Sequence, residues 1–153
     1  MAADVFPIKT TLPLDKAREI IAAALAEGRK QALQPLTVVV LDTGGHIVSM
    51  DREDGAGTLR TEVARGKAMA ALGIGIGSGT IGARNKGREA FLAGVAAAAD
   101  GQFIPVGGGV LVLDGQRHAI GAVGISGDAS DKDEACALAG IRAAGFEPGL
   151  DAS

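Results

Sequence analysis

The chain has 153 residues, of which 47% are hydrophobic and 22% are charged. This composition is typical of a globular protein with its own core, and it excludes a disordered chain. The net charge is −3 and no basic run is interleaved with aromatic residues, so nucleic acid is excluded as a partner. The sequence has no signal-like segment and no apolar run of membrane-spanning length, so we expect a cytoplasmic protein with no membrane partner.

Small residues dominate the chain, which has 24 glycines and neither Trp nor Tyr. The length fits one domain, which we assign to residues 1–153. Cys136 is the only cysteine, so a disulfide within the chain is excluded. Its alanine and leucine neighbours predict a small packed residue, which leaves nucleophilic catalysis as a minor option.

The first half of the chain predicts a helix followed by a hairpin. Leu14–Leu33 has apolar residues at helical spacing and ends before Pro35. Leu36–Leu41 is a β-branched run, which predicts a strand buried on both faces, and His46–Met50 predicts a second strand. Asp42-Thr43-Gly44-Gly45 supplies the turn between these two strands.

The second half predicts three helical segments and another hairpin. Leu59–Leu72 reads as a helix that Thr58 would cap and whose inner stripe would begin with Leu59. The glycine-rich run Gly73–Gly79 follows this helix and not a strand, so it predicts a helix break and not a dinucleotide loop. The remaining predicted elements are helical Thr80–Ala99, split near Gly87, the strands Val110–Leu113 and Ala119–Ile125, and the helix Asp131–Ala144.

Two hairpins cannot bury their apolar faces alone, so we expect them to join in one sheet. The predicted fold class is α+β, with a central antiparallel sheet of two hairpins flanked by helices. Helices as apolar as the segment Ala93–Ala99 are rarely left exposed, which predicts that the chain assembles with copies of itself as a dimer or larger homo-oligomer.

Arg60 and Lys67 are the most informative charged residues. They are seven apart on one predicted helix, so they share nearly the same face two turns apart. They follow the polar loop Asp51–Gly57 and could line a pocket for an anionic group such as a carboxylate. An ordinary solvated helix face is the alternative interpretation.

The segment Gly124–Asp128 follows a strand and precedes the last helix. Backbone amides at such a position can bind an anion. The carboxylates of Asp128, Asp131 and Asp133 would compete with an anion there, and we expect them to accept hydrogen bonds from those amides. Ser130 and Asp133 have the spacing of a capping box.

His46 and His118 are the only histidines, and each lies beside a predicted hairpin turn. Neither has the neighbouring histidines, cysteines or carboxylates of a zinc or iron site, so no metal site is expected. A single histidine can still be an axial ligand of haem. A solvated turn residue is the other interpretation of both.

Four segments together carry a family resemblance that covers nearly the whole chain from residue 12. They are VVVLDTGGHIVSM (38–50), EVARGKA (62–68), PVGGGVLV (105–112) and IGAVGISGDASDKDEACALAG (120–140). In these segments the sequence resembles the GlcG/HbpS family. The resemblance implies a profilin-like fold and a homo-oligomer, and some relatives bind haem or a corrinoid.

The resemblance and the charge pattern together give one candidate site. The ligand-binding residues we predict are Asp54, Arg60, Lys67, Gly108, Ser126 and Asp133. The predicted function is small-molecule binding, either accessory to catabolism with an organic acid as ligand or with haem or another tetrapyrrole as cofactor. The alternative is a cofactor-free isomerase, lyase or hydrolase, in which Lys67 or Arg60 would hold a carboxylate and Asp54 or Asp133 would move a proton.

Overall fold

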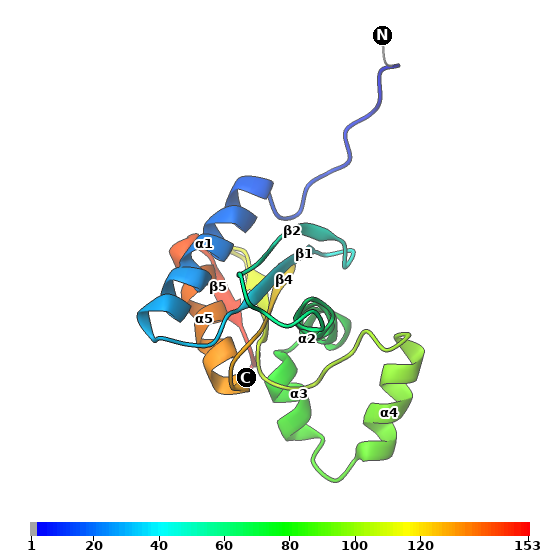
Figure 1. Cartoon of the computed structure of the whole chain (residues 1–153). Helices are drawn as coiled ribbons and strands as arrows, with labels where there is room; N and C mark the ends of the chain where they lie inside the picture. Colours follow the sequence, from blue (N-terminus) through cyan, green and yellow to red (C-terminus); the bar gives the residue numbers. More distant parts are fainter. Residues whose placement is uncertain (1–2) are drawn as a thin grey trace.

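The computed structural model describes residues 3–153, and in this range the chain forms five helices and one five-stranded sheet (Figure 1). The helices are α1 (Leu14–Lys30), α2 (Arg60–Ile74), α3 (Ser78–Arg84), α4 (Glu89–Ala98) and α5 (Ser130–Ala143). The strands are β1 (Thr37–Asp42), β2 (Ile47–Arg52), β3 (Gly109–Leu113), β4 (Ala119–Ser126) and β5 (Glu147–Gly149).

The sheet has the order β2-β1-β4-β3-β5, and every pair of neighbouring strands is antiparallel. The two predicted hairpins are therefore joined edge to edge through β1 and β4, as expected for the α+β class. The short edge strand β5 was not predicted, because only three residues of it pair with β3. Both hairpin turns lie at one end of the sheet, because Asp42 of β1 is paired with Gly121 of β4.

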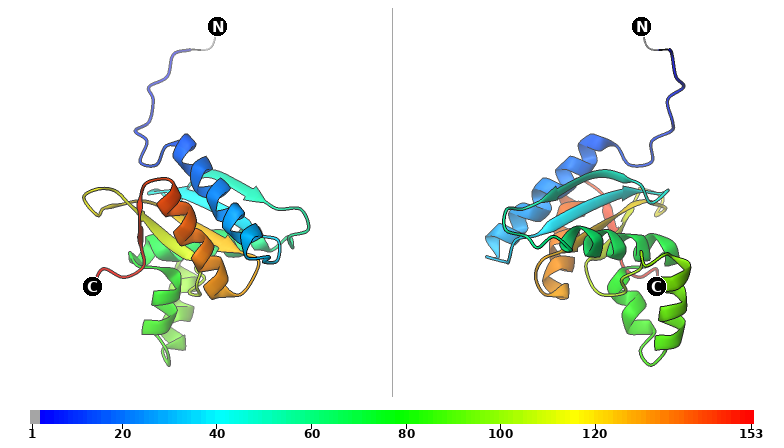
Figure 2. Two further views of the ribbon diagram at one scale, coloured as in Figure 1. Left: turned by 90° about the vertical axis from the view of Figure 1, so that its left-hand side faces the viewer. Right: turned by 45° about the vertical axis from the view of Figure 1, so that its right-hand side comes forward.

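The sheet is covered on both faces. Helices α1 and α5 lie together on one face, over Val38, Val40 and the other side chains that point that way (Figure 2). Helix α2 covers the opposite face, over Val39 and Leu41. Strand β1 is buried along its whole apolar run, which confirms the two-sided burial that its β-branched sequence predicts.

Three local predictions are wrong. Thr58 does not cap α2, which begins at Arg60 with no side-chain cap, and Leu59 is 72% exposed and not part of the inner stripe. Ser130 is the first residue of α5 and not its cap, because the chain stays extended only up to Ala129. Both helices therefore begin one residue away from the start that the capping chemistry of Thr58 and Ser130 predicts: Leu59 precedes α2 in a turn, and Ala129 precedes α5 in an extended conformation.

The segment after α2 follows the predicted break. Gly75 has a φ of +91° and ends the helix in the left-handed conformation, which glycine adopts without strain. Helices α3 and α4 then leave the sheet and extend from one side of the molecule (Figure 1). No residue of α4 is buried, although its sequence is almost entirely apolar. In the described part of the chain, no helix is long and apolar enough to cross a membrane.

Candidate functional site

The candidate site lies at the end of the sheet where β4 stops and α5 begins. Glycines bring α2 unusually close to this part of the sheet. A side chain at Gly124 would overlap the carbonyl oxygen of Ala64, and one at Gly109 would overlap the carbonyl oxygen of Lys67. The close approach places the Lys67 side chain directly against the end of β4.

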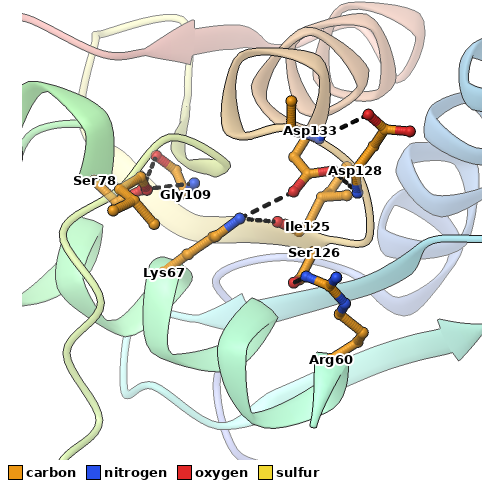
Figure 3. A network of polar contacts seen from close by, with 10 residues as sticks. Arg60, Lys67, Ser78, Gly109, Ile125, Ser126, Asp128 and Asp133 are labelled. Atoms are coloured by element: carbon orange, nitrogen blue, oxygen red, sulfur yellow. Dashed lines mark hydrogen bonds and ion pairs between the residues drawn. The ribbon is translucent and has the colours of Figure 1, made fainter. Parts of the chain in front are cut away.

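Lys67 and Asp133 form a buried ion pair (Figure 3). The Lys67 Nζ atom lies 3.0 Å from the Asp133 Oδ2 atom and also donates to the carbonyl oxygen of Ile125 at 2.9 Å. The two side chains are 3% and 0% exposed. A ligand in solution therefore has no direct access to either charge.

Burial pushes both members of this pair toward their neutral forms. It lowers the pKa of Lys67 below its ordinary value of 10.5, and the nearby Asp133 carboxylate opposes that shift. Burial likewise raises the pKa of Asp133 above 3.8, against hydrogen bonds from the backbone and from Lys67. The attraction between the two groups thus does not fully offset the loss of their hydration, as expected for ions inside a protein.

Two of the three acidic residues predicted to accept hydrogen bonds from the backbone before α5 do so, Asp128 and Asp133; among the described residues no such bond is found for Asp131. Asp133 Oδ1 accepts from the Asp128 backbone N–H at 3.0 Å. The Asp128 carboxylate accepts from the backbone N–H groups of Ala129 and Gln34, at 2.7 and 2.8 Å. These bonds lower the pKa of Asp128, with the bond from Gln34 having the largest effect. The amides before α5 are therefore engaged within the protein.

Arg60 has a different environment from Lys67, although both belong to α2. Its side chain is half-buried, and its Nη1 atom donates to the Ser126 Oγ atom at 3.1 Å (Figure 3). A guanidinium has five N–H donors, so this bond uses a small part of its capacity. Of the two cations in this cluster, Arg60 is therefore the one that is partly exposed to solvent and has N–H groups left to donate to a ligand.

Gly108 closes the site from the side of β3. Its φ is +128°, and a side chain there would lie 2.9 Å from the Lys67 Nζ atom and 2.6 Å from the Ile125 carbonyl oxygen. Only glycine fits this conformation and this space. The structure thus brings together five of the predicted site residues: Arg60, Lys67, Gly108, Ser126 and Asp133.

The three remaining candidates lie elsewhere. Asp54 is exposed in the loop before α2 and lines an open hollow of about 510 Å³ with Arg29 and Arg52. His46 and His118 are exposed in the two hairpin turns, at the end of the sheet opposite Ser126. Strand β4 separates these ends by about 25 Å at 3.3 Å per residue. The histidines and Arg60 of one subunit therefore cannot contact the same part of a small ligand.

Sequence reasoning missed a hydroxyl that adjoins the site. Thr37 of β1 is paired in register with Ser126 of β4, so the two side chains share the face that α2 covers. Thr37 is fully buried, and within the described residues its Oγ1 atom has no hydrogen-bond partner. Arg52 is paired with Thr37 on its other side and shares its face by strand alternation. No motif marks Thr37, because it opens an otherwise apolar strand.

Ser78 was also missed, and it has a structural role beneath the site. Its Oγ atom donates to the Val106 carbonyl oxygen at 2.6 Å and accepts from the Gly109 N–H at 2.7 Å. These bonds fix the glycine-rich turn that leads into β3 (Figure 3). Within residues 3–153, no three or more His, Cys, Asp or Glu side chains gather as a metal ion would require.

This arrangement defines a class of protein: an α+β sheet protein whose polar cluster lies between a covering helix and the end of the central strands. The family model described as haem degrading protein HbpS-like matches residues 12–142, and the chain belongs to this family. No curated protein sequence matches the chain significantly.

Solved structures share the fold at low sequence identity. The PduOC–haem complex is 22% identical with a TM-score of 0.80, and the alignment covers 92% of this chain and 99% of that one. The Klebsiella pneumoniae protein ORFY is 23% identical with a TM-score of 0.79, covering 94% and 97% of the two chains. HbpS is 23% identical with a TM-score of 0.73, covering 93% and 97%.

Proposed function

We propose that this protein binds a small organic molecule through a carboxylate, and that Arg60 is the residue that holds it. The observation that carries the proposal is the hydrogen bond between the Arg60 guanidinium and the Ser126 hydroxyl at the end of the sheet. The half-buried Arg60 guanidinium donates to the buried Ser126 hydroxyl and keeps further N–H groups that can donate to a ligand. Arginine suits this role because its planar fork matches a carboxylate with two parallel hydrogen bonds.

The other site residues support Arg60 from beneath. The buried Lys67–Asp133 pair and Gly108 fix the end of β4, which carries Ser126. Asp54 and Arg52 line a hollow of about 510 Å³ together with Leu25 and Arg29 of α1, and Arg60 does not border it, so this hollow is not part of the proposed site. In this proposal Lys67 and Asp133 position the site and do not contact the ligand.

Haem is the first ligand to test, because it carries carboxylates and because the PduOC relative is a haem complex. Arg60 offers hydrogen-bond donors for a carboxylate of haem. No histidine of the same subunit is near it, because His46 and His118 lie at the other end of the sheet. His46 or His118 could therefore help to hold a haem bound at Arg60 only from another subunit. When bound, haem would supply an iron centre for ligand or redox chemistry.

Binding is better supported than catalysis. The enzyme alternative needs Lys67, Asp133 or Asp54 to exchange a proton with a substrate. Lys67 and Asp133 are 3% and 0% exposed and are bonded to each other, so neither reaches a substrate in this conformation. Asp54 is exposed, but it lines a hollow that does not include Arg60.

An absorption titration of the purified protein with haemin tests the proposal. We expect a saturable Soret shift that weakens at least about tenfold in Arg60→Ala, because a charge-assisted bond is lost. The exposed Arg142 at the end of α5 gives the matched control Arg142→Ala, which should bind as the unsubstituted protein does. If haemin gives no saturable Soret shift, thermal-shift measurements with hydroxy and unsaturated acids test whether the ligand is a small organic acid. Equal ligand affinity of Arg60→Ala and the unsubstituted protein would refute the role of Arg60.

We also propose that the exposed apolar surface of α4 packs against another copy of the chain. Phe91 is 44% exposed, and the alanines that follow it on α4 are largely exposed as well. Apolar surface of this kind is a common sign of subunit contact. Sedimentation should show a smaller assembly for Ala97→Asp than for the unsubstituted protein, and an unchanged mass would refute this contact.

A further inference from the structure

A mainly apolar cavity of about 220 Å³ lies beside the end of α2, on the face of the sheet that this helix covers. Leu111 and Leu113 of β3 line it, together with Leu150 near the C-terminus and the glycines Gly75 and Gly149. A side chain at Gly149 would lie 3.1 Å from atoms of both β3 leucines, so glycine leaves this part of the cavity open. An apolar cavity of about 150 Å³ is enough for benzene, so this one has room for a ring and a short chain.

Two charged side chains border the cavity, Arg117 and Asp151. The Asp151 carboxylate already has partners: it accepts from Arg84 Nη2 at 2.7 Å and from the Ser153 N–H and hydroxyl at 3.0 and 2.6 Å. Arg117 donates from its Nη1 atom to Glu147 Oε1 at 3.0 Å. Because a guanidinium has five N–H donors, Arg117 has donors left for an anionic group at the cavity.

The backbone of Arg117 has a conformation that favours glycine, with a φ of +62°. The turn Asp114–His118 repeats the hydrogen bonding of the turn Asp42–His46. In each turn the aspartate Oδ1 atom accepts from the backbone N–H groups two and four residues later, at 2.9 to 3.0 Å. At the position of Arg117 the other turn has Gly45, whose φ is +79°. The same turn can therefore be formed with glycine, which adopts this conformation without the steric cost that arginine carries.

The ion pair with Glu147 does not account for an arginine at this position. The two side chains are 59% and 51% exposed, and ion pairs with this much exposure contribute little to stability. Their contribution is typically smaller than the cost of the left-handed conformation at a residue other than glycine. Residues in such conformations are common at ligand sites, where the side chain has a role besides folding. Arg117 therefore indicates a binding role for its guanidinium at the cavity.

We propose that this cavity is a second binding site, in which Arg117 binds the carboxylate of a small organic acid and the apolar lining contacts its hydrocarbon part. The combination of apolar walls with a few placed polar groups is characteristic of small-molecule sites. The guanidinium suits a carboxylate because its planar fork can donate two parallel hydrogen bonds. The cavity lies at the hairpin-turn end of the sheet, opposite Ser126 and Arg60, so this site is independent of the function proposed above.

A titration of the ¹⁵N-labelled protein with phenylacetate, followed by NMR, tests the proposal. We expect saturable shifts of the backbone amide signals of Gly75, Gly149 and Leu150, which line the cavity, with a Kd below about 10 mM. Shifts of the Ser126 and Gly127 signals would instead report binding at Arg60, so the two sites are distinguished in one experiment. Saturable shifts confined to Ser126 and Gly127, or none at the cavity, would overturn the proposal.

Arg117→Gly separates a binding role from a structural one. It removes the guanidinium but suits the turn, as Gly45 does in the matching turn. We expect the Kd for phenylacetate at the cavity to rise at least about tenfold, while the urea midpoint stays equal or rises. Glu147→Gln is the matched control, because it removes the ion pair but leaves the guanidinium, and it should bind at least as tightly as the unsubstituted protein. An unchanged Kd or a lower urea midpoint in Arg117→Gly would assign Arg117 to the fold alone and overturn the proposal.

Filling the cavity gives a second test that leaves Arg117 in place. Ala119 lines the cavity from an exposed position at the start of β4, so a larger side chain there is compatible with the fold. Ala119→Phe should abolish the saturable shifts of Gly149 and Leu150, whereas Ala119→Ser, which adds little volume, should keep them. Equal Kd values for the two variants would show that phenylacetate binds outside the cavity and would contradict the proposal.

Discussion

Replacing Lys67 by methionine tests the energetics of the buried pair. The substitution keeps the length of the side chain but removes the cation 3.0 Å from the Asp133 carboxylate. Asp133 is then left as an unpaired buried charge with its remaining bond from the Asp128 N–H. Breaking one side of a buried ion pair costs about 3–5 kcal/mol, so we expect the free energy of unfolding to fall by that amount near neutral pH.

Acidification should return part of this loss. Without Lys67, burial raises the pKa of Asp133 further above its ordinary value of 3.8. A carboxyl whose folded-state pKa is raised favours the folded state most at pH values below its unfolded-state pKa. This advantage disappears as the pH rises through the folded-state pKa. The stability difference between Lys67→Met and the unsubstituted protein should therefore be smaller at about pH 4.5 than at about pH 7.

Urea unfolding at both pH values measures the effect. Lys30→Met is the control, because Lys30 is exposed at the end of α1 and its replacement should change stability by less than about 0.5 kcal/mol. A loss below about 1 kcal/mol in Lys67→Met, or a loss that grows on acidification, would refute the reasoning.

Three further predictions follow from burial and close contacts. Thr37→Val removes a buried hydroxyl that has no partner among the described residues while nearly keeping the side-chain shape, so it should leave stability equal or higher in urea unfolding; a loss of stability would contradict this. Gly124→Ala would press a methyl group against the Ala64 carbonyl oxygen and should cost about 3 kcal/mol or more in urea unfolding. The matched change Gly94→Ala, in open space on α4, should stabilise by up to about 1 kcal/mol, and equal effects would be inconsistent with the packing. Cys136, whose burial raises its thiol pKa to about 11, should react with a thiol reagent only as the protein unfolds; immediate reaction in the folded state would disprove its burial.

The candidate site was predictable where one element carries a strong local pattern. The spacing of Arg60 and Lys67 placed both on one helix, and Gly108 in the turn before β3 was among the predicted site residues. Spacing could not distinguish the buried Lys67 from the half-buried Arg60, because that difference depends on how closely α2 approaches the sheet. The register that sets Thr37 beside Ser126 joins residues far apart in the chain, so no local signal indicated it.

The sequence by itself determined the elements. Apolar periodicity and β-branched runs gave four of the five strands, all helical segments and the α+β class, because these patterns reflect which side of each element is buried. Tertiary structure decided the rest: the joining of β1 to β4, the added strand β5, and the pairing of Lys67 with Asp133. These features depend on contacts between distant segments, and their free energies arise only once the helices have packed on both faces of the sheet.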